Sequence, residues 1–150
     1  MIWKPNVTVA AIIEQDGKFL LVEEHTSQGL KLNQPAGHLE ANESLLRAVM
    51  RETLEESAYD FEPQYLVGVY RWHASASDTT YLRFAYSGRI LAHHAGRALD
   101  EGIVRVLWMT AEEIRATATA SRHRSPLILQ CVEDYLAGKR YPLELVTHYD

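Results

Sequence analysis

Cysteine is nearly absent from this chain of 150 residues, which contains only Cys131. One cysteine cannot form an internal disulfide, and no apolar leader follows Met1, so we expect a reducing, cytoplasmic location. Long apolar runs are missing too, since none approaches the roughly 20 residues that a helix needs to cross a bilayer. We therefore expect no association with a membrane.

Dense positive charge is also lacking. Lys and Arg together number 15 against 20 Asp and Glu, and the formal net charge is −5. Binding to a nucleic-acid polymer is not expected, because it depends on clustered basic side chains that neutralise phosphates. A small phosphate-containing partner is compatible with this charge, since a bound divalent cation can supply the positive charge that phosphates need. The 7 histidines show no zinc-binding spacing.

Internal repeats, low-complexity tracts and linkers are missing as well, so we predict one domain over residues 1–150. Runs of apolar and β-branched residues predict strands at 7–13, 19–22, 66–72, 81–91 and 103–109, the first two paired as a hairpin around Asp16-Gly17. Residues 27–33 are expected to form a loop. Helices are predicted at 42–58 with Asn42 as N-cap, in a short segment after Thr110, and at 125–136. This order, without a regular βαβ repeat, indicates an α+β fold with helices packed on a mixed sheet.

The helix predicted at residues 42–58 carries three carboxylates on one face. Glu52, Glu55 and Glu56 are spaced i, i+3 and i+4, which places them within an arc of roughly 100°. Like charges this close destabilise an isolated helix by roughly a few tenths of a kcal/mol per pair, and a divalent cation would reverse that sign. Mg²⁺ is a hard cation that prefers oxygen ligands, so these carboxylates suit it. The alternative is an ordinary solvated acidic face, whose negative charge Arg47 and Arg51 partly offset.

The residues around this helix follow a longer pattern. Gly37 is followed by Glu43, Arg51-Glu52, Thr53, Glu55-Glu56, Ala58 and Tyr59 at spacings that match G-x5-E-x7-R-E-U-x-E-E-x-G-U, in which U is a bulky apolar residue. In these residues the sequence resembles the Nudix hydrolases, and all the charged positions match. Thr53 and Ala58 depart from the pattern, because a larger apolar residue and a glycine are usual there. Alanine costs about 1 kcal/mol at position 58 if the backbone there is left-handed.

The resemblance extends beyond this motif, since residues 4–10, 33–40, 82–84, 124–127 and 135–143 are similar to the NudJ-type branch of the family. It implies a Nudix-type α/β/α sandwich and a Mg²⁺-dependent enzyme, with Mn²⁺ as a substitute. The implied reaction is hydrolysis of phosphoanhydride bonds in small organic pyrophosphates by a metal-activated water, with nucleoside tri- and diphosphates and thiamine-type pyrophosphates as substrates. Nucleotide sugars or dinucleotides are alternative substrates. A catalytically silent nucleotide-binding module is an alternative of another class, and it would be expected to have lost some of the acids. A monomer or homodimer is expected.

The resemblance also implies roles for particular residues. Glu52, Glu55, Glu56 and the carbonyl of Ala36 are expected to bind the metal. Arg51 and Glu43 are expected to brace the loop and the helix that hold these ligands. Glu101, or Asp100 beside it, is a candidate for an additional acid. The candidates for substrate contact are Arg83, Asn33, Gln34 and Trp72.

Each substrate candidate has a structural alternative. Arg83, inside the apolar segment 82–84, is either a phosphate clamp or an outward-facing strand residue. Asn33 and Gln34 either hydrogen-bond near the substrate or cap their own turn. Trp72 and Trp3 either stack on a planar ring or pack in a core or an interface.

Overall fold

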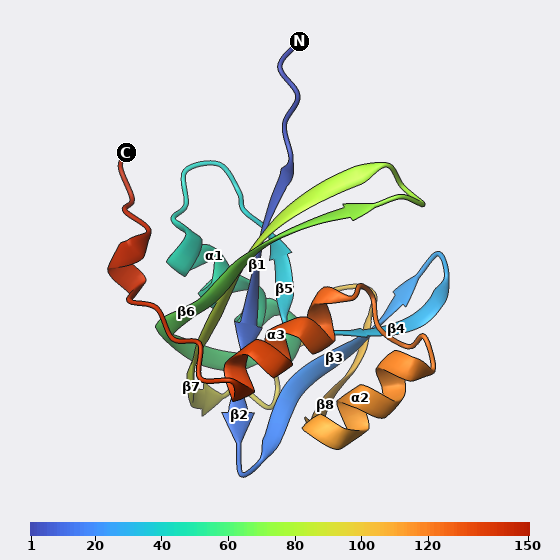
Figure 1. The fold of residues 1–150 in the computed structure, drawn as a ribbon. Helices are drawn as coiled ribbons and strands as arrows, with labels where there is room; N and C mark the ends of the chain where they lie inside the picture. The colour runs from blue at the N-terminus through green and yellow to red at the C-terminus, as the bar shows by residue number, and fades with distance from the viewer.

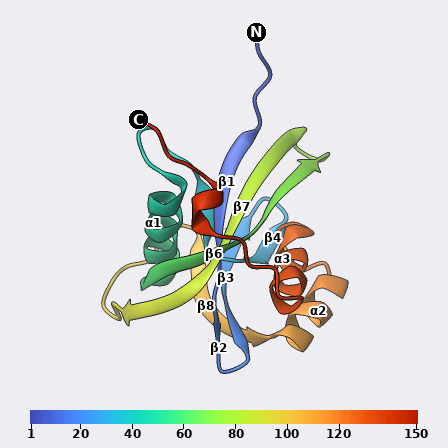
Figure 2. The same cartoon turned by 60° about the vertical axis from the view of Figure 1, so that its left-hand side comes forward.

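Three layers build the fold. Helix α1 (Leu45–Ser57) covers one face of the central strands, and helices α2 (Ala111–Thr119) and α3 (Leu127–Leu136) lie on the opposite side (Figures 1 and 2). This computed structural model describes all 150 residues. The predicted α+β class and the α/β/α arrangement are confirmed.

A mixed four-stranded sheet occupies the middle layer, and a second sheet lies beside it. The first has the order β5 (Ala36–His38), β1 (Asn6–Ile12), β7 (Thr79–His93) and β6 (Tyr59–Ala74). In it β1 and β7 are parallel, whereas the β5–β1 and β6–β7 pairs are antiparallel. The second sheet is antiparallel, with β3 (Lys18–Thr26) pairing with β2 (Glu14–Gln15), β4 (Gly29–Asn33) and β8 (Ile103–Thr110). A short 3-10 helix, η1 (Leu143–Leu145), lies near the C-terminus.

Apolar side chains on the two faces of β1 pack against different helical layers, so the core is divided into two clusters. Val9 and Ala11 pack in one cluster with Val49 of α1, whereas Ile12 packs in another with Ile128 of α3. Successive strand residues point to opposite faces of a sheet. Both faces of β1 are therefore buried, and this strand lies in the interior of its sheet.

This burial explains why the predicted pairing of the first two strands is wrong except at its end beside the turn. The turn at Asp16-Gly17 forms, with φ of 53° and 81°, but beyond the 2-residue strand β2 the ladder with β3 extends only to the carbonyl of Ile13, which accepts from the amide of Leu20 at 3.0 Å. β1 pairs with β5 and β7 instead. Both faces of β1 are apolar, and both are kept from water only if helices cover the sheet on each side. The expected loop at residues 27–33 is also wrong over residues 29–33. These form β4, in which Leu32 is buried in the core.

The N-terminus of α1 differs from the prediction, whereas its C-terminus shows the expected strain. Asn42 is not the N-cap, since its backbone is left-handed with φ of 66°, and Ser44 caps the helix by accepting a hydrogen bond from the amide of Arg47 at 3.1 Å. At the other end Ala58 has φ of 63° and ψ of 19°, and its N–H donates to the carbonyl of Leu54 at 2.9 Å. This left-handed conformation favours glycine. Ala58 therefore carries the penalty that its departure from the Nudix pattern predicts.

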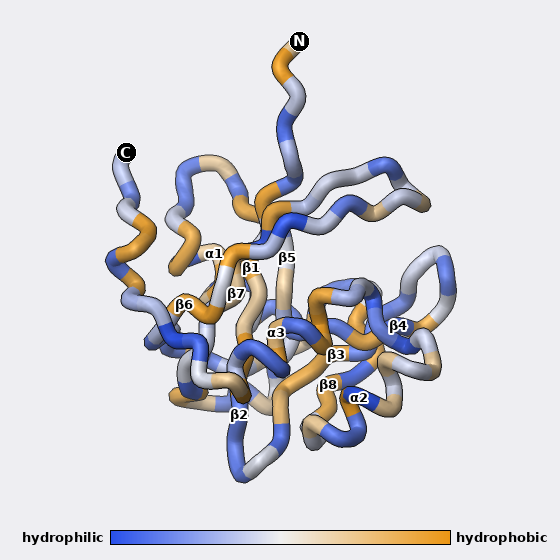
Figure 3. Tube along the Cα trace, viewed as in Figure 1, coloured by the Kyte–Doolittle hydropathy of each residue, from blue (hydrophilic) through white to orange (hydrophobic).

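Hydropathy follows the layers of the fold. Figure 3 shows apolar stretches along the central strands and polar residues at the β2–β3 turn. The capping box predicted at Thr110 forms with Glu113 at the start of α2. None of the helices has the length and apolar character needed to cross a membrane.

Replacing Ala58 with glycine is expected to stabilise the protein. Relief of the left-handed backbone is worth roughly 1–2 kcal/mol, and loss of one buried methyl group costs about 0.8 kcal/mol. The net gain of up to about 1 kcal/mol should raise Tm in thermal denaturation by about 2–4 °C. Ala137, the C-cap of α3 with φ of −73°, provides the matched control, because Ala137→Gly should lower Tm. A similar rise in both variants would contradict the explanation.

Candidate active site

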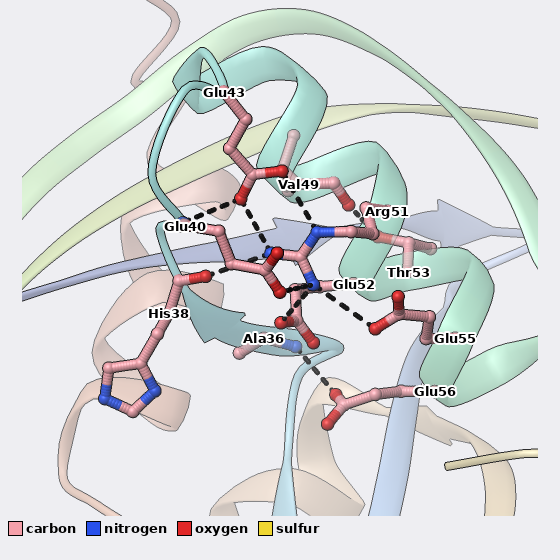
Figure 4. Close-up of polar contacts among 10 residues, drawn as sticks. All are labelled: Ala36, His38, Glu40, Glu43, Val49, Arg51, Glu52, Thr53, Glu55 and Glu56. Atoms are coloured by element: carbon pink, nitrogen blue, oxygen red, sulfur yellow. Dashed lines mark hydrogen bonds and ion pairs between the residues drawn. The ribbon is translucent and has the colours of Figure 1, made fainter.

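Arg51 joins three carboxylates of the motif, Glu43, Glu52 and Glu55, into one cluster (Figure 4). Its Nε and Nη2 donate to the two carboxylate oxygens of Glu43 at 3.0 and 2.7 Å, a bidentate geometry that fixes both side chains. Its Nη1 donates to Glu52 at 2.9 Å and to Glu55 at 3.2 Å. The hydrogen bond to Arg51 holds the pKa of Glu43 below its ordinary value, and the same bond raises the pKa of Arg51.

The same guanidinium connects α1 to the loop that precedes it. Nη2 donates to the carbonyl of His38 at 3.0 Å, and Nη1 lies 3.4 Å from a carboxylate oxygen of Glu40. Glu43 in turn accepts a hydrogen bond from the amide of Glu40 at 2.9 Å. Arg51 and Glu43 thus lie where a brace between loop and helix is expected.

The close approach of β5 to α1 depends on Gly37. A Cβ at this position would lie 2.1 Å from Cδ of Glu52, so a larger residue must displace that carboxylate. Beside it, the amide of Ala36 donates to Oε1 of Glu56 at 2.9 Å (Figure 4). Ala36, whose carbonyl is an expected metal ligand, therefore lies next to the acids of the helix.

Burial changes the titration of two of these glutamates. It raises the pKa of Glu52 to about 7, although the hydrogen bond from Arg51 opposes the shift. It raises the pKa of Glu56 to about 8, because desolvation outweighs the hydrogen bond from the amide of Ala36. Carboxylates with such pKa values favour a bound proton or a nearby cation at neutral pH, which is a common property of functional sites.

A further carboxylate comes from the loop between β7 and β8. Carboxylate oxygens of Glu52, Glu55 and Asp100 all lie within 4.8 Å of one another, and the Asp100 amide donates to the carbonyl of Glu55 at 2.9 Å. Of the two candidates for an additional acid, Asp100 has its carboxylate in this cluster, whereas Glu101 lies in the turn that follows. A set of carboxylate oxygens is the kind of donor set that fits Mg²⁺ or Mn²⁺.

An open cleft of about 780 Å³ adjoins these acids. The β3–β4 and β6–β7 hairpins both contribute to its walls, and Figure 1 shows the two hairpins extending from the body of the protein. The predicted site residues on its lining are Ala36, Glu52, Glu56, Asn33, Arg83 and Trp72. The lining also includes Glu24, Lys31, Tyr81 and Arg124, which sequence spacing did not single out as site residues because their elements meet only in the folded chain.

Arg83 is buried, so the alternative of an outward-facing strand residue is wrong. It is 5% exposed and lines the cleft from β7. Its Nη1 donates to Oε1 of Gln34, and its Nη2 donates to Oδ1 of Asn33, both at 2.9 Å. The side chains of Asn33 and Gln34 therefore hold Arg83 and do not cap their own turn.

An aromatic pair forms another part of the cleft wall. Trp72 of β6 and Tyr81 of β7 are cross-strand partners whose rings stack at a centroid distance of 5.7 Å and an angle of 16°. The ring of His38 lies 6.4 Å from that of Tyr81. Trp3, which is 66% exposed in the N-terminal segment, does not line the cleft. Of the two candidate tryptophans, only Trp72 is placed to meet a ligand there.

Known proteins are similar to this chain in sequence and in fold. The NUDIX domain family matches residues 3–130. The chain belongs to the Nudix hydrolase family. It is 38% identical to phosphatase NudJ of Escherichia coli K12 over 148 residues, which cover 99% of this chain and 94% of that protein. A NUDIX hydrolase from Nitrosomonas europaea is 54% identical, with a TM-score of 0.94 and coverage of 97% of this chain and 98% of that one. As a Nudix hydrolase, the protein is an enzyme that acts on phosphoanhydrides of small molecules.

In this Nudix hydrolase, Gly37→Ala is expected to lower activity because the added Cβ displaces Glu52. Disturbing the orientation of a metal-binding group costs roughly 10–100-fold in metal affinity or activity. Hydrolysis rates over a titration of Mg²⁺ measure the effect. Gly96→Ala is the control, since a Cβ there meets nothing within 4 Å. Wild-type rates in Gly37→Ala would show that the close approach is not required.

Glu56 predicts a pH dependence of the stability of the metal-free enzyme. Its pKa in the folded state, about 8, lies above the ordinary value of 4.5, so the folded state retains a proton that the unfolded state releases. Its contribution to stability is full below pH 4.5 and is lost as the pH rises through about 8. In the presence of a chelator, Glu56→Gln should therefore melt at a higher temperature than the wild type above pH 8, with a shallower decline of Tm. Identical Tm profiles for the two proteins would contradict the burial of this carboxylate.

Proposed function

We propose that this enzyme hydrolyses small organic pyrophosphates in a reaction that depends on Mg²⁺, with Mn²⁺ as a substitute. Nucleoside tri- and diphosphates and thiamine-type pyrophosphates are its proposed substrates. The observation that carries the proposal is the meeting of Glu52, Glu55 and Asp100, within 4.8 Å of one another, beside a cleft that Glu52 and Glu56 line. Oxygen donors without cysteine or histidine favour a hard divalent cation over zinc.

The carboxylates of α1 are proposed to hold the cation. The ligands would be Glu52, Glu55 and Glu56, joined by Asp100 in place of Glu101 and by the carbonyl of Ala36. When bound, the cation supplies polarisation of the phosphate oxygens and a lowered pKa of the attacking water. Arg51 and Glu43 act as positioning residues, because their hydrogen bonds set the direction of the carboxylates.

The protein's own carboxylates are proposed to accept the proton of the attacking water. A general base works best when its pKa lies near the working pH. Burial raises the pKa of Glu52 and Glu56 in the metal-free protein, and a bound cation would lower it, so a carboxylate oxygen left without the cation is the one suited to this role. Asp100 reaches the same cluster from the loop between β7 and β8. The proton therefore passes to an oxygen of one of these three side chains.

The remaining cleft residues are proposed to bind the substrate away from the acids. Arg83 offers a guanidinium fork to phosphate oxygens. Trp72, backed by Tyr81, offers a ring face to a nucleobase or a pyrimidine. The relation to an enzyme called a phosphatase supports release of inorganic phosphate as the outcome.

Nucleotide sugars and dinucleotides form the second substrate class. A cleft of about 780 Å³ has room for them, which supports keeping them in the test. A catalytically silent nucleotide-binding module is disfavoured, because none of the acids of the motif is lost.

We also propose that residues 1–150 act as one domain, in the cytoplasm, as a monomer or homodimer. Leu143 and Val146, close to the C-terminus, pack on the same core cluster as α1, which supports a single unit. Neither a membrane nor a nucleic-acid polymer is a proposed partner.

Phosphate release from a substrate panel tests the proposed function. The panel holds nucleoside tri- and diphosphates, thiamine diphosphate, an ADP-sugar and a dinucleoside polyphosphate, each with Mg²⁺, with Mn²⁺ and with a chelator. Metal-dependent release of inorganic phosphate from the tri- and diphosphates is expected, and Glu56→Gln should lose most of it. Activity confined to the sugar or the dinucleotide would replace the proposed substrates. Activity that is unchanged by the chelator would overturn the proposed metal dependence.

A further inference from the structure

Arg83 combines deep burial with a charge that no carboxylate offsets. It is 5% exposed, and it forms no ion pair within 4.0 Å, whereas six other arginines do. Those six are Arg51, Arg89, Arg105, Arg115, Arg122 and Arg124. A buried charge without a partner is costly. An arrangement of this kind is stabilised when an anion binds.

The groups that hold Arg83 are all neutral. They are the amide oxygens of Asn33 and Gln34 at 2.9 Å and, more distantly, Sγ of Cys131 at 3.8 Å. Burial raises the pKa of the Cys131 thiol, so the sulfur carries no charge at neutral pH. Gln34 is itself only 1% exposed, and its Nε2 donates to the carbonyl of Ile128 at 2.9 Å. Its amide is thereby oriented with the oxygen toward the guanidinium.

The other charged groups nearby already have hydrogen-bond or ion-pair partners. Asp134 of α3 accepts from the hydroxyl of Tyr70, the cross-strand neighbour of Arg83, at 2.7 Å and lies 3.1 Å from Lys139. Of the other cations that line the cleft, Arg124 pairs with Glu24 at 2.6 Å, and Lys31 donates to the carbonyl of Ser121 at 2.6 Å. Arg83 itself lines the cleft, and no side-chain carboxylate lies within ion-pair distance of it.

Strand order separates Arg83 from the acids. Thr8 of β1 is the register partner of both His38 of β5 and Arg83 of β7, so two strand spacings, roughly 10 Å, separate β5 from β7. Ala36 and Gly37, which meet Glu56 and Glu52, belong to β5. Arg83 and the acids thus line the same cleft from different elements of the fold.

We propose that Arg83 forms a subsite that binds a phosphate group without a metal ion. Asn33 and Gln34 are positioning residues, because their amide oxygens hold the guanidinium and leave its positive charge available to the phosphate. The neutral amides orient the guanidinium without neutralising it. The identity of the ligand as a phosphate of the substrate rests on the proposed function.

The test measures binding of inorganic pyrophosphate by titration calorimetry, in the presence of a chelator. Wild-type enzyme should bind the anion, and Asn33→Asp should bind it at least ~10-fold more weakly, because the added carboxylate pairs with Arg83 at the same position. Arg83→Gln should lose binding to a similar extent. Gln15→Glu adds the same charge at an exposed position on β2 and should bind as the wild type does.

Steady-state kinetics with Mg²⁺ and a nucleoside triphosphate separate positioning from folding. Asn33→Asp and Gln34→Leu should raise KM by at least ~10-fold with a much smaller change in kcat. A lowered Tm without a change in KM would mean that Gln34 is only structural, and would overturn its positioning role. Pyrophosphate binding that is absent from the wild type, or equal in wild type and Asn33→Asp, would overturn the subsite. Pyrophosphate binding as expected, in an enzyme with no Mg²⁺-dependent hydrolysis, would overturn the proposed function and leave the subsite standing.

Discussion

One guanidinium sets the geometry of the active site. Arg51 lies within ion-pair distance of the carboxylates of Glu40, Glu43, Glu52 and Glu55, which would otherwise repel one another around a single helix. Only arginine presents five donors in one rigid plane, so that Nε and Nη2 can hold Glu43 while Nη1 holds the acids of the helix. Its bond to the carbonyl of His38 then fixes the end of β5 against α1. The positions of Gly37 and Ala36 beside the acids follow from that contact.

The cleft is lined by hairpins of two different sheets. The strands β1 and β3 are close in sequence, yet they belong to different sheets, and the chain changes sheet at the short strand β2. The β3–β4 and β6–β7 hairpins therefore extend from separate sheets and leave the cleft between their side chains. One sheet contributes Arg83 and Trp72 to its lining, and the other contributes Glu24 and Lys31. The acids lie where the edge strand β5 meets α1, so the acids and the proposed substrate-binding residues belong to different elements.

The local part of the site could be predicted from the sequence, whereas the distant contacts could not. Glu52, Glu55 and Glu56 share a helix face at fixed spacing, and Gly37 and Glu43 precede them in one continuous motif. Asp100 reaches the cluster through a backbone hydrogen bond to Glu55 that no local pattern encodes. The burial of Arg83 depends on Gln34 and α3, which the chain brings together only on folding. The pairing of β1 with β5 and β7 could not be predicted for the same reason, since it depends on the helices that cover both faces of this strand.

The left-handed end of α1 links the stability of the helix to that of the loop that carries Asp100. The carbonyls of Ala58 and Glu55 accept hydrogen bonds from the amides of His94 and Asp100 at 2.8 and 2.9 Å. Fraying of the last turn of α1 therefore breaks the anchors of the loop as well, so the two segments open as one cooperative unit. Glu55 and Asp100 leave the cluster together in such an opening. Assembly of the acidic cluster therefore depends on the order of this helix end as well as on the positions of the side chains.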